Sequence, residues 1–317
     1  MIRSLLKSFR HTYLDLRLRS SGLHIRILER PGLWMQDAEL EQLSDDLRKV
    51  ASATLPVGSL TYGVFSADRK RMSSSIVTLV SRPDGTPIAF NALAIMTLST
   101  LPKPTEVLHL GLVMVDPNER SKNLSWVLYG LTCFLLFVRR KFRPLWISNV
   151  TQVPAVVGMV SGMFSNVYPS PSASRRTLSQ LQVARRIMAD HRYVFGVGDE
   201  ADFDENRFVI TNAYTGGSDD LMKTWEQAPK HRDDSYNDFC ARELDYERGD
   251  DVLQIGQLDM AAIGRYLSKE VPSSALSGLL LVAGMVILRR LILPILHWFE
   301  SDQEWSILRP VKDKTNV

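Results

Sequence analysis

Alternating hydrophobic and polar positions predict a sheet in the first half of the chain. Residues 74–80 and 88–98 are rich in Val, Ile, Ala and Phe, and they flank RPDGTP, whose Asp-Gly pair is typical of a hairpin turn. Residues 107–115, VLHLGLVMV, predict a third strand, and residues 145–150 predict a short buried strand after a proline. The hairpin makes at least one pair of these strands antiparallel.

Helical patterns fill the segments between these strands. Residues 37–51 carry acids in their first turn and bases in their last, as helices favour. We expect a second helix to open at Pro117 and to run through SWVLYGLTCFLLFVRRKF, which is apolar on nearly every face and must be buried in a core, a partner or lipid. Residues 153–164 predict a third helix. This order of elements predicts an α/β fold in which a mixed α+β sheet is flanked by helices.

The second half of the chain changes character twice. After PSPSAS, a basic helix is expected near residues 177–189, followed by polar, acid-rich loops to about Asp251. Residues 275–288 are almost wholly apolar, and two arginines separate them from a second apolar run at 291–299. The first run is shorter than the ~20 residues that span a bilayer, and each arginine would cost about 2.5–3.5 kcal/mol at its centre. We therefore expect an interfacial or re-entrant helix, with a buried helix or an oligomer contact as the alternatives.

The start of the chain is basic. Within residues 1–30, Ile2, Leu5, Leu6 and Phe9 have helical spacing, which predicts an amphipathic segment and a second membrane anchor. The seven bases of this segment face only two acids; they are Arg3, Lys7, Arg10, Arg17, Arg19, Arg26 and Arg30. We divide the chain into this segment (1–35), a main domain with an extension after residue 169 (36–270), and an apolar C-terminal helix with a polar tail (271–317).

Composition narrows the class of protein. Hydrophobic residues make up 45% and charged residues 23%, which is typical of a folded globular chain and excludes a disordered or multi-span membrane protein. The net charge of +3 is too small to indicate nucleic-acid binding, and no recognition helix or aromatic platform is evident. The two cysteines have no ligand-like spacing, so we expect a reducing compartment and no zinc site. A cytoplasmic, peripherally membrane-associated protein without a metal is the simplest interpretation.

Five consecutive segments carry a resemblance to a known family. The PDG hairpin, the strand VLHLGLVMVDP, the stretch NERSKNLSW, the strand PLWISNV and the helix QVPAVVGMVSGMF resemble the core of the GCN5-related N-acetyltransferase (GNAT) superfamily, over roughly residues 36–168. The resemblance rests on the order and spacing of elements. It implies transfer of an acyl group from an acyl-coenzyme A or acyl-carrier-protein thioester to an amine, here a small or lipid-like one.

The family's phosphate-binding turn has a counterpart here. Its Arg/Gln-x-x-Gly-x-Gly/Ala pattern aligns with the six residues Arg120, Ser121, Lys122, Asn123, Leu124 and Ser125. The arginine is retained, and Asn and Ser stand in place of the glycines. Asn tolerates left-handed backbone, and Lys122 adds a cation. The resemblance implies that these amides hold the phosphates and that a backbone N–H near Val113 to Val115 stabilises the oxyanion.

The family's second motif is altered. Its Asn-x-x-Ala-x-x-x-Tyr pattern places Gln152 at the Asn, Ala155 at the Ala and Met159 at the Tyr, whose phenol protonates the leaving thiolate. A thioether cannot donate a proton. Another group is then the acid, or water serves, or no transfer takes place.

Three residues are candidates for the chemistry, and each has a structural alternative. His109 in the third strand is a possible base, or a hydrogen-bonded core histidine. Glu119 is a possible base, or, like Asp116, a helix cap. Tyr168 would supply the missing phenol, as would Tyr193, or either is a buried aromatic residue.

Three acid-rich clusters lie in the second half of the chain. The clusters at 199–206, 233–238 and 249–251 lack the spacing of a calcium loop and are interpreted as solvated loops.

Our first hypothesis is a GNAT-like acyltransferase that meets a membrane. The second is a non-catalytic GNAT-like module that docks on a membrane or a partner, and the third is a subunit of a homo-oligomer.

Overall fold

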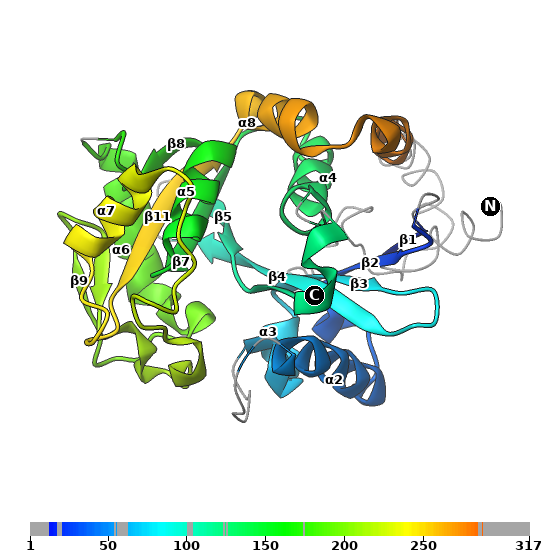
Figure 1. Ribbon diagram of the computed structural model, residues 1–317, viewed down its shortest axis with the longest axis horizontal. Helices are drawn as coiled ribbons and strands as arrows, with labels where there is room; N and C mark the ends of the chain where they lie inside the picture. The colour runs from blue at the N-terminus through cyan, green and yellow to red at the C-terminus, as the bar shows by residue number, and fades with distance from the viewer. Residues whose placement is uncertain are drawn as a thin grey trace.

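The structure is a computed structural model that describes residues 13–17, 21–53, 55, 63–99, 104–122, 124, 126–173, 175–284 and 287. These residues form one mixed sheet flanked by helices, so the predicted α/β class is confirmed. The described strands follow the order β1-β2-β3-β4-β5-β7-β11-β10-β9, while β6 pairs with β4 and β8 pairs with β11. Figure 1 shows the two halves of the sheet on either side of β5.

The first half is an antiparallel meander. Its strands are β1 (Tyr13–Arg17), β2 (His24–Glu29), β3 (Ser75–Ser81), β4 (Pro87–Leu98), β5 (Thr105–Leu110) and β6 (Val113–Val115). Its helices are α2 (Asp37–Ser52) and α3 (Arg69–Met72). The predicted hairpin is confirmed: Gly85 has φ 91°, and Arg82 N–H donates to Thr86 O at 2.9 Å. Strands β1 and β2 are a finding that helical periodicity does not predict, and residues 1–12, with the amphipathic pattern, lie outside the described residues.

The second half is also antiparallel. Its strands are β7 (Leu145–Thr151), β8 (Ser165–Tyr168), β9 (Asp202–Asp204), β10 (Val209–Thr211) and β11 (Asp251–Leu258). Its helices are α5 (Pro154–Met163), α6 (Leu178–Asp190), α7 (Asp234–Glu243) and α8 (Met260–Arg265). The prediction of loops up to residue 251 is therefore wrong, because β9, β10 and α7 lie within that stretch. The predicted helices at 153–164 and 177–189 are confirmed to within one residue.

Helices cover both faces of the sheet. On β4, Phe90 and Ala92 pack into the cluster with α2, and Met96 and Leu98 pack into the cluster with α6. Because alternate residues of a strand share a face, α2 and α6 lie on the same side, which we call the first face. Asn91 donates to Leu128 O from the second face, which α4 (Thr132–Arg139) and α5 cover.

The predicted third strand is interrupted by a β-bulge. Asn91 and Ala94 of β4 are three positions apart in the sequence. Their partners Val113 and His109 are four positions apart. One extra residue therefore lies on the β5–β6 side, which bends the strand away from its course. A Cβ added at Gly111 would overlap the carbonyl oxygen of Ala92, so glycine lets the two backbones approach at this bend.

The helix after the bulge begins later than its sequence predicts. Residues Pro117–Lys122 form the 3-10 turn η3, and Trp126–Leu131 form the π-helix η4 that continues into α4. Two side chains hold carbonyl groups of η4: Asn91 donates to Leu128 O, and Tyr266 Oη donates to Trp126 O at 2.9 Å. The helix is buried in the core of the chain, so its apolar faces are covered without a partner or lipid.

The apolar C-terminal prediction is partly within the described residues. Residues 273–284 form a helix that packs Leu279, Val282 and Ala283 into the core. Its other side exposes Leu280 and Leu281, which are 56% and 64% accessible. Among the described residues, no helix is both long and apolar enough to cross a membrane.

Candidate functional site

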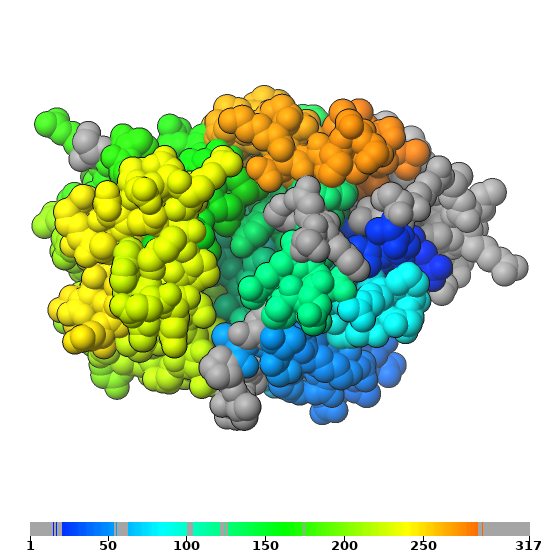
Figure 2. Space-filling view, in the orientation of Figure 1, coloured from blue at the N-terminus to red at the C-terminus, as the bar shows by residue number. Residues whose placement is uncertain are grey.

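The two halves of the sheet separate beside the bulge. Strands β5 and β7 pair in parallel from Val107 with Trp146 to Leu110 with Asn149, and the pairing then stops. Beyond that point β6 pairs only with β4, whereas β7 continues beside β11. We call the opening between β6 and the end of β7 the splay. Figure 2 shows a hollow between the yellow surface of the second half and the blue-to-green surface of the first.

One edge of β6 is free of strand partners among the described residues. Ala92 N–H donates to Leu112 O, and Asp116 N–H donates to Ile88 O, both at 2.8 Å. Residues in an antiparallel ladder alternate between facing the partner and facing away from it. The N–H groups of Val113 and Val115 therefore point away from β4 and into the splay, as backbone donors for a ligand.

The turn after β6 is fixed by its own side chains. Asp116 Oδ1 accepts from the Asn118 N–H at 2.9 Å, as its alternative role of cap predicts. Glu119 is only 3% exposed and is held by Arg82, whose Nη2 lies 2.5 Å from Oε1. Glu119 therefore ties the hairpin turn to η3, and this position favours a structural role over that of a base.

The predicted phosphate-binding residues lie between this turn and the helix. Arg120 is exposed, Ser121 and Lys122 close η3, and Leu124 is buried. Asn123 and Ser125 lie outside the described residues. The segment precedes the N-terminus of the continuous helix Trp126–Arg139, where the helix dipole favours an anion. The structure thus brings the turn and the free β6 edge next to each other along the chain.

Gln152 occupies the opposite side of the splay. It follows β7 directly, is 1% exposed, and accepts a 2.6 Å hydrogen bond from Tyr246 Oη on its backbone oxygen. Its side-chain Oε1 and Nε2 are both buried, and neither has a hydrogen-bond partner among the described residues. A buried amide without partners costs free energy, so both of its polar atoms are open to a ligand or a water molecule.

His109 is a core histidine in this structure. It is 4% exposed, its Nδ1 lies 3.1 Å from Ser148 Oγ, and its ring packs on Phe195 at 5.1 Å. Burial lowers the pKa of His109 to about 4. The ring is therefore neutral at physiological pH and is a weak base, which favours the core alternative over catalysis.

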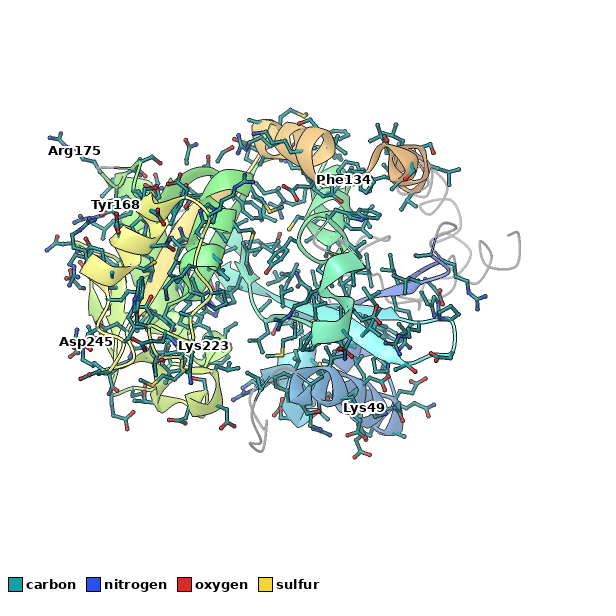
Figure 3. The ribbon with its side chains drawn as sticks, viewed as in Figure 1. Lys49, Phe134, Tyr168, Arg175, Lys223 and Asp245 are labelled. Carbon is teal, nitrogen blue, oxygen red and sulfur yellow. The ribbon has the colours of Figure 1, made fainter. Side chains whose placement is uncertain are left out.

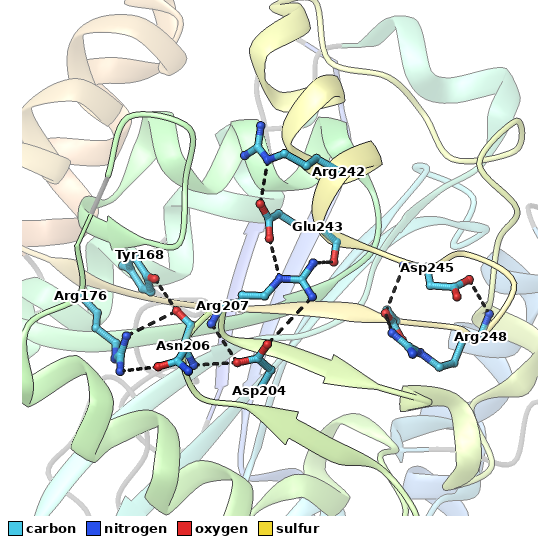
Figure 4. Close-up of polar contacts among 10 residues, drawn as sticks. Tyr168, Arg176, Asp204, Asn206, Arg207, Arg242, Glu243, Asp245 and Arg248 are labelled. Carbon is cyan, nitrogen blue, oxygen red and sulfur yellow. Dashed lines mark hydrogen bonds and ion pairs between the residues drawn. The ribbon is translucent and has the colours of Figure 1, made fainter.

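Tyr168 is engaged away from the splay. Its Oη donates to Asn206 O at 2.8 Å, and its ring packs edge-on against Phe208 at 5.0 Å. Figure 3 shows Tyr168 and Phe134 in opposite halves of the molecule. The surrounding network joins β9, the turn before β10 and α7 through Asp204, Arg207 and Glu243 (Figure 4). Tyr168 thus has the role of a buried aromatic residue, and Tyr193 is 55% exposed at the surface.

The acid pair at the start of β11 is the main site feature that the sequence pattern did not reveal. Asp250 and Asp251 are 0% and 5% exposed, so the interpretation of residues 249–251 as a solvated loop is wrong. Asp250 is paired with Arg248 at 2.6 Å. Asp251 accepts from Tyr214 Oη at 3.1 Å, and burial raises its pKa to about 7. The signal was the apolar strand VLQIG directly after the acids.

A strap crosses from Asp251 towards β6. It consists of residues 213–222, with the 3-10 turns η6 (Ala213–Thr215) and η7 (Asp219–Leu221). Ala213 N–H donates to Gly249 O at 2.8 Å at one end, and Leu221 packs at the other end against the α2 cluster, which includes Met114 of β6. The strap therefore connects the two sides of the splay on the first face.

Metal ligands are not grouped in the part of the chain that the structure describes. No three His, Cys, Asp or Glu side chains there are arranged to hold a metal ion. Both cysteines are buried free thiols, and burial raises the pKa of Cys133 to about 12.

Comparison with known proteins adds no family to this geometry. No protein-family model matches the chain, and no curated protein matches it.

Proposed function

We propose that the chain is an N-acyltransferase that uses the splay to hold an acyl thioester. The observation that carries this proposal is the free edge of β6. There the Val113 and Val115 N–H groups point into the splay, where β7 no longer pairs with the first half of the sheet. An amide-containing chain such as the pantetheine arm of coenzyme A or of a carrier protein can pair with such an edge. The adjacent turn at Arg120 then lies where the phosphates of the donor would be.

We assign roles in acyl transfer to residues at the splay, with no residue assigned as the acid. A backbone N–H at Val113 or Val115 would stabilise the oxyanion that forms when an amine attacks the thioester carbonyl. The second candidate is a non-catalytic module, and the engagement of Glu119 by Arg82 and of Tyr168 by Asn206 favours it.

Coenzyme A binding tests the proposal. Calorimetric titration of the full chain with coenzyme A and with dodecanoyl-coenzyme A should show saturable binding. The Arg120→Ala, Lys122→Ala variant should bind at least roughly 100-fold more weakly, because each of two hydrogen bonds to charged groups contributes about 1.5–3 kcal/mol.

A matched control removes two cations elsewhere. The Arg185→Ala, Arg242→Ala variant has the same net charge as the test variant, and it should bind as the wild type does, since both arginines are exposed and pair with Glu205 and Glu243. If wild-type protein binds neither ligand, the coenzyme A form of the proposal fails, and a carrier-protein donor or the non-catalytic module remains.

We also propose that the C-terminal helix places this site at a membrane surface. Its outer side exposes Leu280 and Leu281, while Leu279 and Val282 anchor the helix to the core, and Ile287 further along the chain is also exposed. The sequence continues with Arg289 and Arg290 and a second apolar run, which suits an interface between acyl chains and anionic headgroups. A donor or acceptor with an apolar chain is consistent with this placement.

Vesicle flotation tests the membrane proposal. Wild-type protein should float with phosphatidylglycerol vesicles, and Leu280→Asp, Leu281→Asp should reduce binding roughly 100-fold, because two buried leucines contribute about 3 kcal/mol. Leu178→Asp on α6 is the control, because Leu178 is 70% exposed on another element. Wild-type protein that stays off vesicles and elutes as a dimer would instead assign this face to a second copy of the chain.

A further inference from the structure

The buried carboxyl of Asp251 has no role in the thioester site described above. Leu253 and Ile255 of β11 pack into the α6 cluster, so strand alternation places Asp251 on the first face as well. Tyr214, which packs against the same cluster, donates to Asp251 Oδ1. Asp251 is 5% exposed, so its carboxyl is almost fully buried.

The strand register places Asp251 near the splay. Thr151 pairs with Val252, so one further step brings Gln152 opposite Asp251. The parallel register pairs Leu110 with Asn149, and Val113 and Gln152 each lie three residues further on. Allowing for the extra residue of the bulge, the Val113 N–H, Gln152 and Asp251 lie at about the same height along neighbouring strands. We call these three positions the row.

The strap closes this row on the first face. An added Cβ at Gly249 would meet Tyr214 Cδ2 at 3.1 Å and Met222 Sδ at 3.3 Å, so these side chains cover the start of β11. Met222 is 37% exposed, which places solvent on the outer side of the strap. Leu221 continues the cover to the α2 cluster beside β6. The row therefore lies under a short lid of apolar and phenolic side chains.

Resting on the proposed function, we infer that Asp251, Tyr214 and Gln152 form the acceptor subsite, where Asp251 binds a primary ammonium group and takes its proton. Among the described residues, neither the donor nor the acceptor of the Gln152 amide has a partner, and the Asp251 carboxyl provides further acceptor oxygens in a buried setting. An alkylammonium ion carries three donors and no acceptor, which matches a carboxylate better than a hydroxyl or thiol acceptor would. The chemical class of acceptor is thus a primary amine on an apolar chain.

The transfer step balances with these groups. The ammonium gives one proton to the Asp251 carboxylate, and the resulting amine uses its lone pair to form the C–N bond at the thioester carbonyl carbon. The C–S bond breaks, and its electron pair leaves on sulfur. The second proton of the nitrogen passes to this thiolate, so the products are an amide and a thiol, and Asp251 returns its proton to solvent.

The charged surroundings of Asp251 set the pH dependence. Its pKa is raised to about 7, chiefly by burial; the Tyr214 hydrogen bond lowers this pKa and the neighbouring Asp250 raises it. Asp250 is itself paired with Arg248. Because only the carboxylate accepts the proton, the rate of transfer should rise as the pH rises through about 7.

Thiol release from dodecanoyl-coenzyme A, with n-octylamine as the acceptor, tests this inference across pH 5.5 to 9. Asp251→Asn should lower kcat at least 100-fold and remove the acidic limb of the profile, while KM for the thioester is unchanged. Tyr214→Phe should move the acidic limb to higher pH, because the hydrogen bond that lowers the pKa of Asp251 is lost. A structural role would lower activity equally at every pH.

Separate titrations distinguish the two ways to fail. If the wild type binds neither coenzyme A nor dodecanoyl-coenzyme A, the coenzyme A form of the proposed function fails, and this inference fails with it. If coenzyme A binds but n-octylamine is neither bound nor acylated, or if both variants retain the wild-type acidic limb, the acceptor subsite is wrong while the thioester site stands. If Asp251→Asn does not fold, the pH–rate profile of Tyr214→Phe decides. An acidic limb at the same pH as in the wild type overturns the inference.

Discussion

Replacing Arg139 with methionine should lower the free energy of unfolding by about 3–5 kcal/mol at neutral pH. Arg139 of α4 lies 2.7 Å from Glu29 Oε1 at the end of β2, and the Glu29 side chain is fully buried. Methionine keeps much of the apolar stem but leaves the Glu29 carboxylate buried without this cation. Chemical denaturation followed by circular dichroism measures the change.

The loss should depend on pH in a defined direction. Burial raises the pKa of Glu29 above its usual 4.5, while Arg139 lowers it, so the variant raises this pKa further. A carboxyl with a raised pKa in the folded state contributes stability that is present below the unfolded pKa and is lost as the pH rises through the folded pKa. The difference between variant and wild type should therefore be small near about pH 4 and large at about pH 7.5.

Two controls separate charge from general disturbance. Arg139→Lys keeps the positive charge and should retain a larger part of the stability at pH 7.5. Arg185→Met removes the exposed partner of Glu205 and should leave the unfolding midpoint nearly unchanged, because exposed ion pairs contribute little. A loss in Arg139→Met that is equal at both pH values would contradict the assignment to Glu29.

Gly130→Ala should destabilise the protein by about 3 kcal/mol through overpacking. A Cβ added at Gly130 in the π-helix η4 would overlap the ring of Tyr266. That ring cannot move freely, because it is 4% exposed, packs near Phe134, and donates from its Oη to Trp126 O. The same overlap should loosen the start of the helix beside the splay. Thermal unfolding measures the change in midpoint.

The matched control is Gly162→Ala in α5. An added Cβ there meets nothing within 4 Å, so alanine should be neutral or should stabilise by about 0.5–1 kcal/mol. The Gly130→Ala, Tyr266→Leu double variant should be less destabilised than the sum of its single variants, since the clash is shared. Additive losses would mean that Tyr266 is not what limits space at Gly130.

The sequence pattern predicts elements well where an apolar run or a helical period is bounded by turn or capping residues. The hairpin 75–98, α2, β7, α5 and α6 are such elements, and their boundaries agree with the structure to within about two residues. Strand β11 does not have this pattern. Its Gln254 is fully buried and bonds to Asn149, Ser161 and Pro169 O, so a polar residue occupies a core position. Only the tertiary structure supplies these partners.

The candidate site was predictable in its backbone and not in its side chains. The free edge at Val113 and Val115 and the turn at Arg120 follow from the order of strand, turn and helix. The positions of His109, Glu119 and Tyr168 depend on partners 39, 37 and 38 residues away, which no local pattern contains. Asp251 was hidden for the same reason, because its burial comes from the strap and from α6.

The π-helix is a second feature that the sequence does not encode locally. Its residues WVLYGL are compatible with an ordinary α-helix by composition. Its carbonyl groups are held instead by Asn91 from β4 and by Tyr266 from the C-terminal part of the chain. Such single-turn π segments occur frequently at functional sites.

Amide hydrogen exchange measured by NMR tests the central claim, that the free edge of β6 holds the acyl thioester. In the free protein the Val113 and Val115 amides should exchange faster than that of Met114, whose N–H faces β4. Saturation with dodecanoyl-coenzyme A should slow Val113 and Val115 at least roughly tenfold and leave Met114 unchanged, because a bound chain would then accept their hydrogen bonds. Binding that leaves both valine amides as fast as before would place the ligand elsewhere and contradict the account.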